Sequence, residues 1–155
     1  MIVLTLVGAV TATDDDARYQ VGSLHYRIDP TYGAQVYRYV YNNSGSTIAA
    51  NLAVMQENGT DIGEVIVCGA AAPVARVMGV TVSSIATGYY GWVVCDGACL
   101  CTSDGGTTAN TAQKTAASGK FTDGVTGTDE LPLWAQATES PAGDGGTFIG
   151  LIRAL

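Results

Sequence analysis

The dipeptide Asp96-Gly97 and the residues around it constrain the fold more than any other part of this 155-residue chain. Residues 77–94 are rich in Val, Ile, Thr and Tyr, and a second β-rich run, 98–102, follows the dipeptide. Asp and Gly both tolerate the positive φ of a type I′ turn, so this pattern predicts a hairpin over residues 89–102. The segment offers no nucleophile beside a base and no phosphate-binding glycine loop, which favours a scaffold that works by surface contact.

Short β-rich runs continue along the whole chain at intervals of roughly ten residues, a spacing typical of sandwiches and barrels. Twenty glycines separate these runs, and strands do not alternate with helical patterns. We therefore predict an all-β fold, a single domain over residues 1–155 that forms a β-sandwich or barrel of roughly nine or ten short strands with little helix. Besides the hairpin, the predicted strands are 1–7, 22–28, 35–41, 47–55, 62–68, 74–82, 131–138 and 147–155.

Residues 103–118 differ in character from the rest of the chain. They are mostly small and polar, and such a stretch buries too little apolar area to order itself. We expect a mobile loop, or an arm that a neighbouring molecule orders. The N-terminal and C-terminal strands, 1–7 and 147–155, are candidates for contacts between subunits because both are strongly apolar.

Charge is scarce in this chain and its sign is acidic. Charged residues make up 14% of the sequence, hydrophobic residues 47%, and the net charge is −7, whereas a soluble domain usually carries about 25% charged residues. A chain so poor in charge either exposes neutral Thr, Ser, Ala and Gly or covers much of its surface with partners. Its seven cations are scattered, so we expect no direct binding to nucleic acid or to an anionic membrane.

The four cysteines and the single histidine do not form a metal-binding pattern. Cys99 and Cys101 share one face of a strand by their spacing, where thiols act as small buried hydrophobes. A zinc site would need a second pair of ligands, which is missing, so we predict no metal or cofactor. A disulfide between Cys95 and Cys99 across the hairpin stays an alternative to reduced thiols.

The alternation of apolar and polar residues in the predicted strand 22–28 indicates which side chains share a face. Leu24, Tyr26 and Ile28 share one side, which we predict to be buried, and His25 lies on the opposite, polar side. As a catalytic base, His25 would need a partner that the sequence does not suggest. No serine sits in a Gly-x-Ser-x-Gly turn, so we predict no catalytic residue and a protein that is not an enzyme.

A stripe of aromatic side chains is the strongest candidate for a contact surface. Tyr37, Tyr39 and Tyr41 share one face of a predicted strand. Tyrosine combines apolar area with a hydroxyl group and is enriched in protein interfaces. The same stripe fits the edge of a hydrophobic core equally well. Three more candidates for contacts with other molecules come from the C-terminal part of the chain: Trp134, Phe148 and Ile152.

Three stretches of this sequence resemble the capsid decoration (cement) proteins of tailed bacteriophages. They are Pro73-Val74-Ala75-Arg76-Val77-Met78-Gly79-Val80, Ile85-Ala86-Thr87-Gly88-Tyr89-Tyr90-Gly91-Trp92-Val93 and Tyr37-Arg38-Tyr39-Val40-Tyr41-Asn42. The resemblance covers about residues 20–125 and its motifs are compositional, without a catalytic anchor. The cysteines at 95, 99 and 101 are not part of that pattern.

The resemblance implies a virion structural protein on the outer surface of a capsid, made in the cytoplasm of a bacterial host. It implies a homotrimer that clamps neighbouring subunits of the major capsid protein after the shell expands. Two other functions stay open from the sequence: a different virion or surface module, such as a tail, fibre or receptor-binding domain, and a small-ligand-binding β-barrel.

Overall fold

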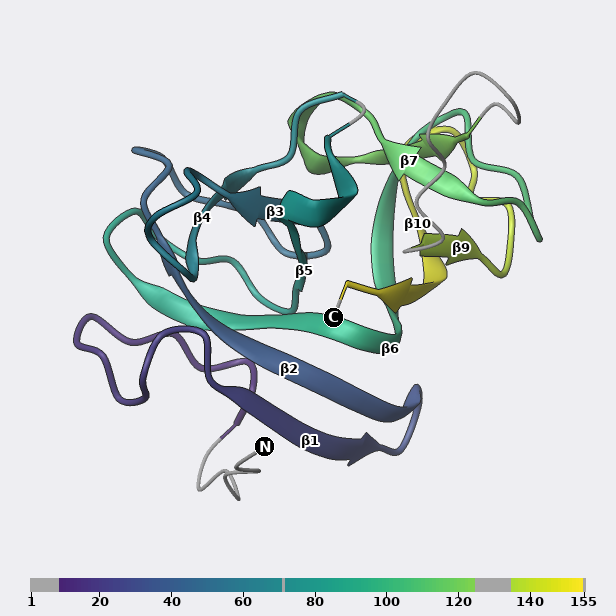
Figure 1. Cartoon of the computed structure of the whole chain (residues 1–155). Coiled ribbons are helices and arrows are strands. Elements are labelled where there is room, and N and C mark those ends of the chain that lie inside the picture. Colours follow the sequence, from purple (N-terminus) through teal and green to yellow (C-terminus); the bar gives the residue numbers. More distant parts are fainter. Residues whose placement is uncertain (1–8, 71, 125–134, 155) are drawn as a thin grey trace.

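The computed structural model describes residues 9–70, 72–124 and 135–154, and within them the chain is all-β, as predicted (Figure 1). The described part contains ten strands and two short 3-10 helices, and no helix in it is long and apolar enough to cross a membrane. The elements are β1 (Leu24–Asp29), β2 (Gly33–Asn42), β3 (Ala53–Gln56), β4 (Glu64–Val67), η1 (Val74–Arg76), β5 (Val77–Thr81), β6 (Tyr90–Asp104), β7 (Gln113–Thr115), η2 (Ala117–Gly119), β8 (Phe121–Asp123), β9 (Ala135–Ala137) and β10 (Asp144–Arg153).

Five of these strands close into a small ring. β2 pairs with β6 along one edge and with β4 along the other, while β3 connects β4 to β5 and β5 pairs with β6. β1 extends the sheet from β2, and β10 and β9 extend it from β6. Each strand of the ring contributes one buried side chain to a single cluster: Val40, Val54, Val65, Met78 and Val93.

The predicted hairpin at Asp96-Gly97 is wrong, because β6 runs through this dipeptide as one strand of 15 residues. Asp96 pairs with Val36 while Val94 pairs with Tyr37, so one extra residue in β6 forms a β-bulge. Gly97 has φ +109°, and a Cβ there would collide with the carbonyl oxygen of Ala34. The dipeptide therefore bends β6 where it leaves β2 and continues along β10 (Figure 1).

The predicted orientation of β1 is also wrong. His25 is buried and its ring contacts that of Trp92, with the centroids 6.1 Å apart. Tyr26 is 49% exposed and Ile28 69% exposed. Alternation identified which residues share a face, but the apolar face of β1 points outward.

The remaining strand predictions agree with the structure in part. The predicted strand at 47–55 shrinks to β3, preceded by an isolated bridge between Ile48 and Ile85. Residues 103–118, predicted to be a loop or arm, contain the end of β6 and all of β7, and Thr107, Gln113 and Thr115 are buried against the same chain. The predicted strand 1–7 and the first half of 131–138 lie outside the described residues.

Candidate contact surface

The outward face of the β1–β2 hairpin is the most prominent apolar surface on the described strands. Tyr26 and Ile28 are large and exposed, and they pair across the hairpin with Val36 and Ala34. Residues directly opposite each other in an antiparallel pair lie on the same face, so these side chains form one patch with the half-buried Leu24, which lies opposite Arg38 at the border of the patch. We call this patch the ribbon face: Leu24, Tyr26, Ile28, Ala34 and Val36.

The free edge of β1 accompanies this apolar patch. Within the described residues β1 pairs only with β2. Just before β1, the Ser23 carbonyl accepts a 3.0 Å hydrogen bond from the Tyr39 amide. Because antiparallel strands alternate between bonded and non-bonded positions, residues 25 and 27 face β2. The N–H and C=O groups of Leu24, Tyr26 and Ile28 then point to the open edge, where another strand can pair.

A short turn holds the tip of the hairpin. Oδ1 of Asp29 accepts hydrogen bonds from the amides of Thr31 (2.8 Å) and Tyr32 (3.0 Å), and Gly33 follows with φ +78°. Three-residue hairpin loops place a glycine at this left-handed position. The turn therefore fixes the register of β1 on β2, and with it the ribbon face.

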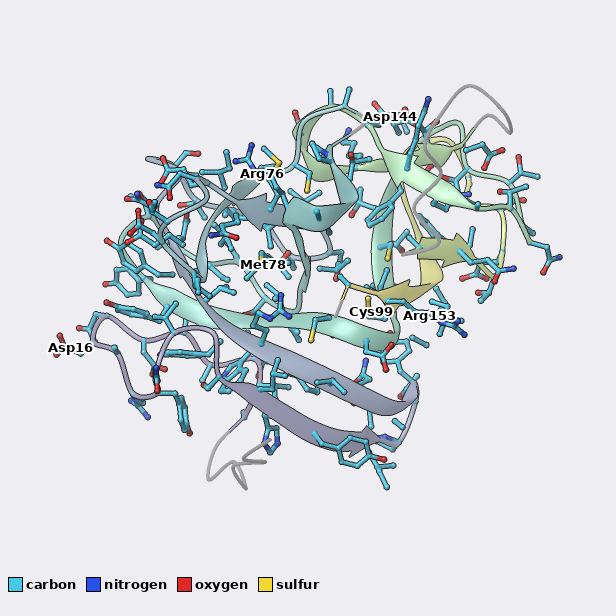
Figure 2. The ribbon with its side chains drawn as sticks, in the orientation of Figure 1. Asp16, Arg76, Met78, Cys99, Asp144 and Arg153 are labelled. Carbon is cyan, nitrogen blue, oxygen red and sulfur yellow. The ribbon has the colours of Figure 1, made fainter. Side chains whose placement is uncertain are left out.

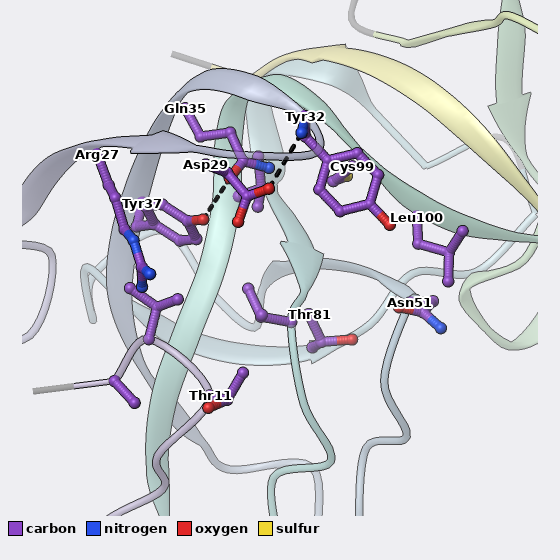
Figure 3. A pocket seen from close by; sticks show the side chains of 14 residues that line it. Thr11, Arg27, Asp29, Tyr32, Gln35, Tyr37, Asn51, Thr81, Cys99 and Leu100 are labelled. Atoms are coloured by element: carbon purple, nitrogen blue, oxygen red, sulfur yellow. Dashed lines mark hydrogen bonds between the residues drawn. The ribbon is translucent and has the colours of Figure 1, made fainter.

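The opposite side of the hairpin covers a cavity of about 410 Å³ (Figure 3). Arg27, Asp29, Gln35 and Tyr37 line it from the hairpin. The Tyr37 hydroxyl donates to Oε1 of Gln35, and burial, followed by the nearby Asp29 carboxylate, raises the pKa of Tyr37 to about 12. This phenol stays protonated at neutral pH and its proton is held by a neighbour, so it contributes structure rather than acid–base chemistry.

The predicted tyrosine stripe lies mainly inside the protein. Tyr37 and Tyr39 are buried, and Tyr41 is half-buried with its ring 4.9 Å from that of Tyr90. The Tyr39 ring packs against Trp92 at a centroid distance of 4.9 Å. Of the two interpretations of the stripe, the structure therefore supports the hydrophobic core.

The other predicted contact residues are buried as well, where the structure describes them. Phe148 and Ile152 of β10 belong to the same core cluster as Tyr37 and Tyr39, and Phe148 packs edge-to-face on Phe121. Trp134 lies outside the described residues. Buried side chains offer no surface to a partner. The large apolar side chains that are exposed among the described residues are Tyr26, Ile28, Ile62 and Tyr89. Of these, Tyr26 and Ile28 lie on the ribbon face, on the side of β1 that the sequence pattern predicts to be buried.

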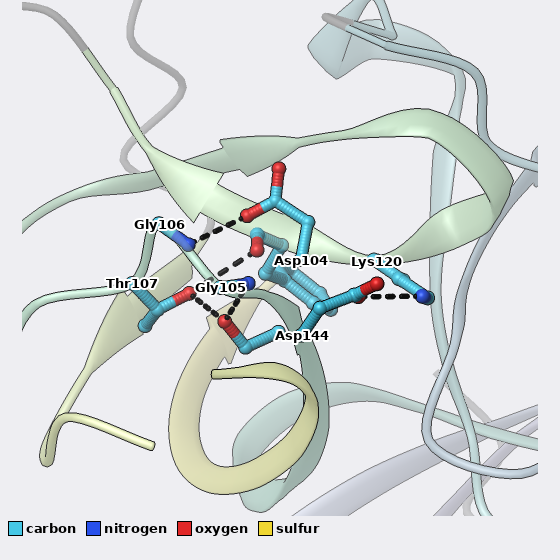
Figure 4. Close-up of polar contacts among 8 residues, drawn as sticks. Asp104, Gly105, Gly106, Thr107, Lys120 and Asp144 are labelled. Carbon is cyan, nitrogen blue, oxygen red and sulfur yellow. Dashed lines mark hydrogen bonds and ion pairs between the residues drawn. The ribbon is translucent and has the colours of Figure 1, made fainter. Parts of the chain in front are cut away.

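Polar contacts organise the far end of β6 (Figure 4). Oδ1 of Asp104 accepts a 2.9 Å hydrogen bond from the Gly106 amide, and the Ser103 hydroxyl donates to that of Thr107 at 2.9 Å. Lys120 forms a 2.7 Å ion pair with Asp144, which lowers the pKa of that carboxyl group. Every one of these contacts joins segments of this chain, so the cluster stabilises the turn after β6.

The four cysteines are free and buried. Sγ of Cys99 lies 3.9 Å from Sγ of Cys101 on one face of β6, as the spacing predicted. The alternative disulfide between Cys95 and Cys99 is not formed. Burial raises the pKa of Cys68 to about 12 and that of Cys95 to about 11, so neither thiol is ionised at neutral pH. These thiols pack as apolar groups (Figure 2 shows Cys99 beside the sheet).

The fold is similar to that of a solved phage protein. Comparison with protein-family models finds no match. Comparison with curated proteins also finds none. Among solved structures, the N base of the head fiber gp8.5 of bacteriophage phi29 matches with a TM-score of 0.58. The match covers 77% of this chain and 95% of that chain. The two sequences are 16% identical, so the similarity shows a shared fold.

Proposed function

We propose that this chain is a structural protein of a bacteriophage virion, carried on the outer surface of the head, where it acts by binding and not by catalysis. The observation that carries the proposal is the shared fold with the N base of a phage head fiber over nearly all of that chain. The sequence resemblance to capsid decoration proteins supports the same location independently. The exposed ribbon face supports a role that depends on contact with neighbouring molecules.

Decoration of the capsid is the more specific form of this proposal. A homotrimer that spans the junctions between major capsid subunits would add buried area to each junction and resist the outward pressure of packaged DNA. Its second and third contacts gain from effective concentration, so weak individual contacts suffice. A low content of charge suits such contacts, since interface cores are depleted in charged residues. An acidic protein outside the shell has no need to bind DNA.

A second candidate is the base of a fibre on the phage head. The solved structure with the matching fold is itself the base of a head fiber, which favours this function specifically. The two candidates differ in location and abundance: a decoration protein covers the lattice of the head, whereas fibre bases occupy fewer, separated positions.

Sedimentation with purified phage heads tests the proposal. Heads from a phage that lacks this protein are mixed with the purified chain and pelleted, and we expect saturable binding to expanded heads. Ile28→Lys, on the ribbon face, should weaken binding. Tyr89→Lys is the matched control, because Tyr89 is 39% exposed but lies just before β6, outside that face. Absence of binding by the unmodified chain to expanded heads would refute a place on the head.

A further inference from the structure

We propose that the ribbon face and the free edge of β1 bind a second copy of this chain, with β1 pairing antiparallel to β1 of the other copy across a two-fold axis. The inference names a partner for the candidate contact surface and places the contact within the proposed function. It rests on the backbone of β1, on the order of its side chains and on the residues that border it.

The backbone of β1 is ready for pairing. Its register with β2 runs without interruption from Leu24 to Asp29. Proteins usually protect an edge strand with a proline, a charged side chain (lysine above all) or a bulge. β1 contains no proline, lysine or bulge, and its two charged residues, Arg27 and Asp29, are at the odd positions whose backbone groups face β2. The outward N–H and C=O groups of its three even-numbered residues are therefore presented in a regular row.

In one register of the two β1 strands, all of these outward groups form hydrogen bonds between the copies. With Tyr26 opposite Tyr26 of the second copy, Leu24 lies opposite Ile28 of that copy, and every outward N–H and C=O of these residues finds a partner. A register displaced toward the turn places Pro30, which has no N–H, opposite Leu24 of the other copy. It also places the two Arg27 side chains directly opposite each other. A displacement the other way requires Gly22, which lies outside β1 with φ +87°. The sequence around β1 thus selects the register centred on Tyr26.

The side chains agree with this register. An antiparallel pair keeps the apolar sides of both strands on one face only when even positions meet even positions. Each of Leu24, Tyr26 and Ile28 then gains an apolar cross-strand neighbour. On the other face, His25 lies opposite Arg27 of the second copy, which avoids a pair of arginines.

The small area buried by this contact indicates where it would be populated. A stable interface buries about 800 Å² on each partner, and a pair of short strands buries less, so we expect a weak dimer in solution. On a head surface many copies are held close together, which strengthens a weak contact. A two-fold contact cannot close a trimer, so it would connect copies that belong to neighbouring trimers.

Cross-linking of the full chain in solution tests the pairing. In the selected register the two Tyr26 Cα atoms lie about 5.5 Å apart, which is within disulfide range. Tyr26→Cys should give an oxidised dimer on a denaturing gel at sub-millimolar concentration, whereas Tyr89→Cys should not, because Tyr89 is 39% exposed but lies just before β6, outside the ribbon face. Adding Ile28→Lys to Tyr26→Cys should reduce the dimer several-fold while the thermal unfolding midpoint shows that the fold is retained.

Three outcomes would overturn this inference. Equal cross-linking of the two cysteine variants would show random collision. No dimer from Tyr26→Cys would show that the edge is not paired between copies. A dimer that appears only after deletion of residues 1–8 would show that the chain's own N-terminal segment occupies the edge. The cross-linking experiment uses no phage heads. A failure of two copies to pair can therefore be distinguished from a failure of the chain to bind heads.

Discussion

The hydroxyl group of Tyr39 donates a 2.9 Å hydrogen bond to Oδ2 of Asp14 in the protein interior. Asp14 also forms a 2.6 Å ion pair with Arg18 and a backbone bridge with Tyr90 of β6. Asp14 thereby joins the segment before β1 to two strands of the ring, to β2 through its carboxylate and to β6 through its backbone. This segment precedes the edge strand that carries the ribbon face, so its attachment supports the candidate contact surface.

Replacing Tyr39 by phenylalanine should destabilise the protein. The change removes the donor and leaves a buried carboxylate oxygen without that partner, which costs about 1–3 kcal/mol. Urea unfolding measures the loss. Tyr41→Phe is the control, since Tyr41 is half-buried on the same strand. Equal unfolding free energies for the two variants would contradict the role assigned to the Tyr39 hydroxyl.

Alkaline conditions should unfold the protein through its buried phenols. Burial raises the pKa of Tyr37 from 10.0 to about 12, and burial also raises that of Tyr39. A raised pKa contributes stability that is complete below the unfolded value and is lost as pH rises through the folded value. We expect the unfolding free energy to fall above pH 10 and the Tyr37→Phe variant to show a shallower fall. Ultraviolet titration of tyrosine follows the ionisation. A flat stability profile up to pH 12 would contradict burial of these phenols.

Gly97→Ala should be far more damaging than Gly45→Ala. Both glycines have positive φ, but a Cβ at Gly45 meets nothing within 4 Å, whereas at Gly97 it would collide with the Ala34 carbonyl oxygen. The backbone cost at either site is about 1–3 kcal/mol, and the collision at Gly97 adds to it by displacing β2 from β6. Thermal unfolding compares the two variants. Similar midpoints would contradict a tight bulge at this position.

Asp123 should stabilise the region after β6 at neutral pH and lose that effect in acid. Burial alone would raise its pKa, but hydrogen bonds from Thr108, Gln113 and Thr111 outweigh burial and hold the pKa below 3.8. A lowered pKa contributes stability above the unfolded value, which disappears as pH falls through the folded value. Asp123→Ala should cost about 1 kcal/mol at neutral pH, and the difference from the unmodified chain should shrink in acid. Asp16→Ala, at an exposed carboxylate, is the control, and a loss that does not vary with pH would contradict this assignment.

The fold class could be predicted from the sequence because β-rich runs separated by glycine signal strands locally. The hairpin at Asp96-Gly97 could not be distinguished from a bulge on the same grounds. A type I′ turn needs residues with positive φ, and the bend that β6 makes at Gly97 uses a positive φ as well, so only the partner strands decide between the two. Here β2 and β10 continue the pairing on either side of Gly97, and no local pattern announces two such partners.

The candidate site shows a different limit. Alternation in β1 identified that Leu24, Tyr26 and Ile28 share a face, but burial depends on which face the rest of the chain covers. Trp92 and Tyr37 pack on the side of His25, and this leaves the apolar side outward. The rule that places apolar residues inside therefore assigned this strand the wrong way round, and the exposed apolar side is what makes the ribbon face a candidate contact surface.

Localisation on intact virions tests the central claim most directly. Purified phage particles are labelled with an antibody against this chain and imaged by electron microscopy, with particles that lack the chain as the control. The proposal predicts label on the head, over the whole lattice for a decoration protein or at separated points for a fibre base. Label confined to the tail, or none on intact particles, would contradict a structural role on the phage head.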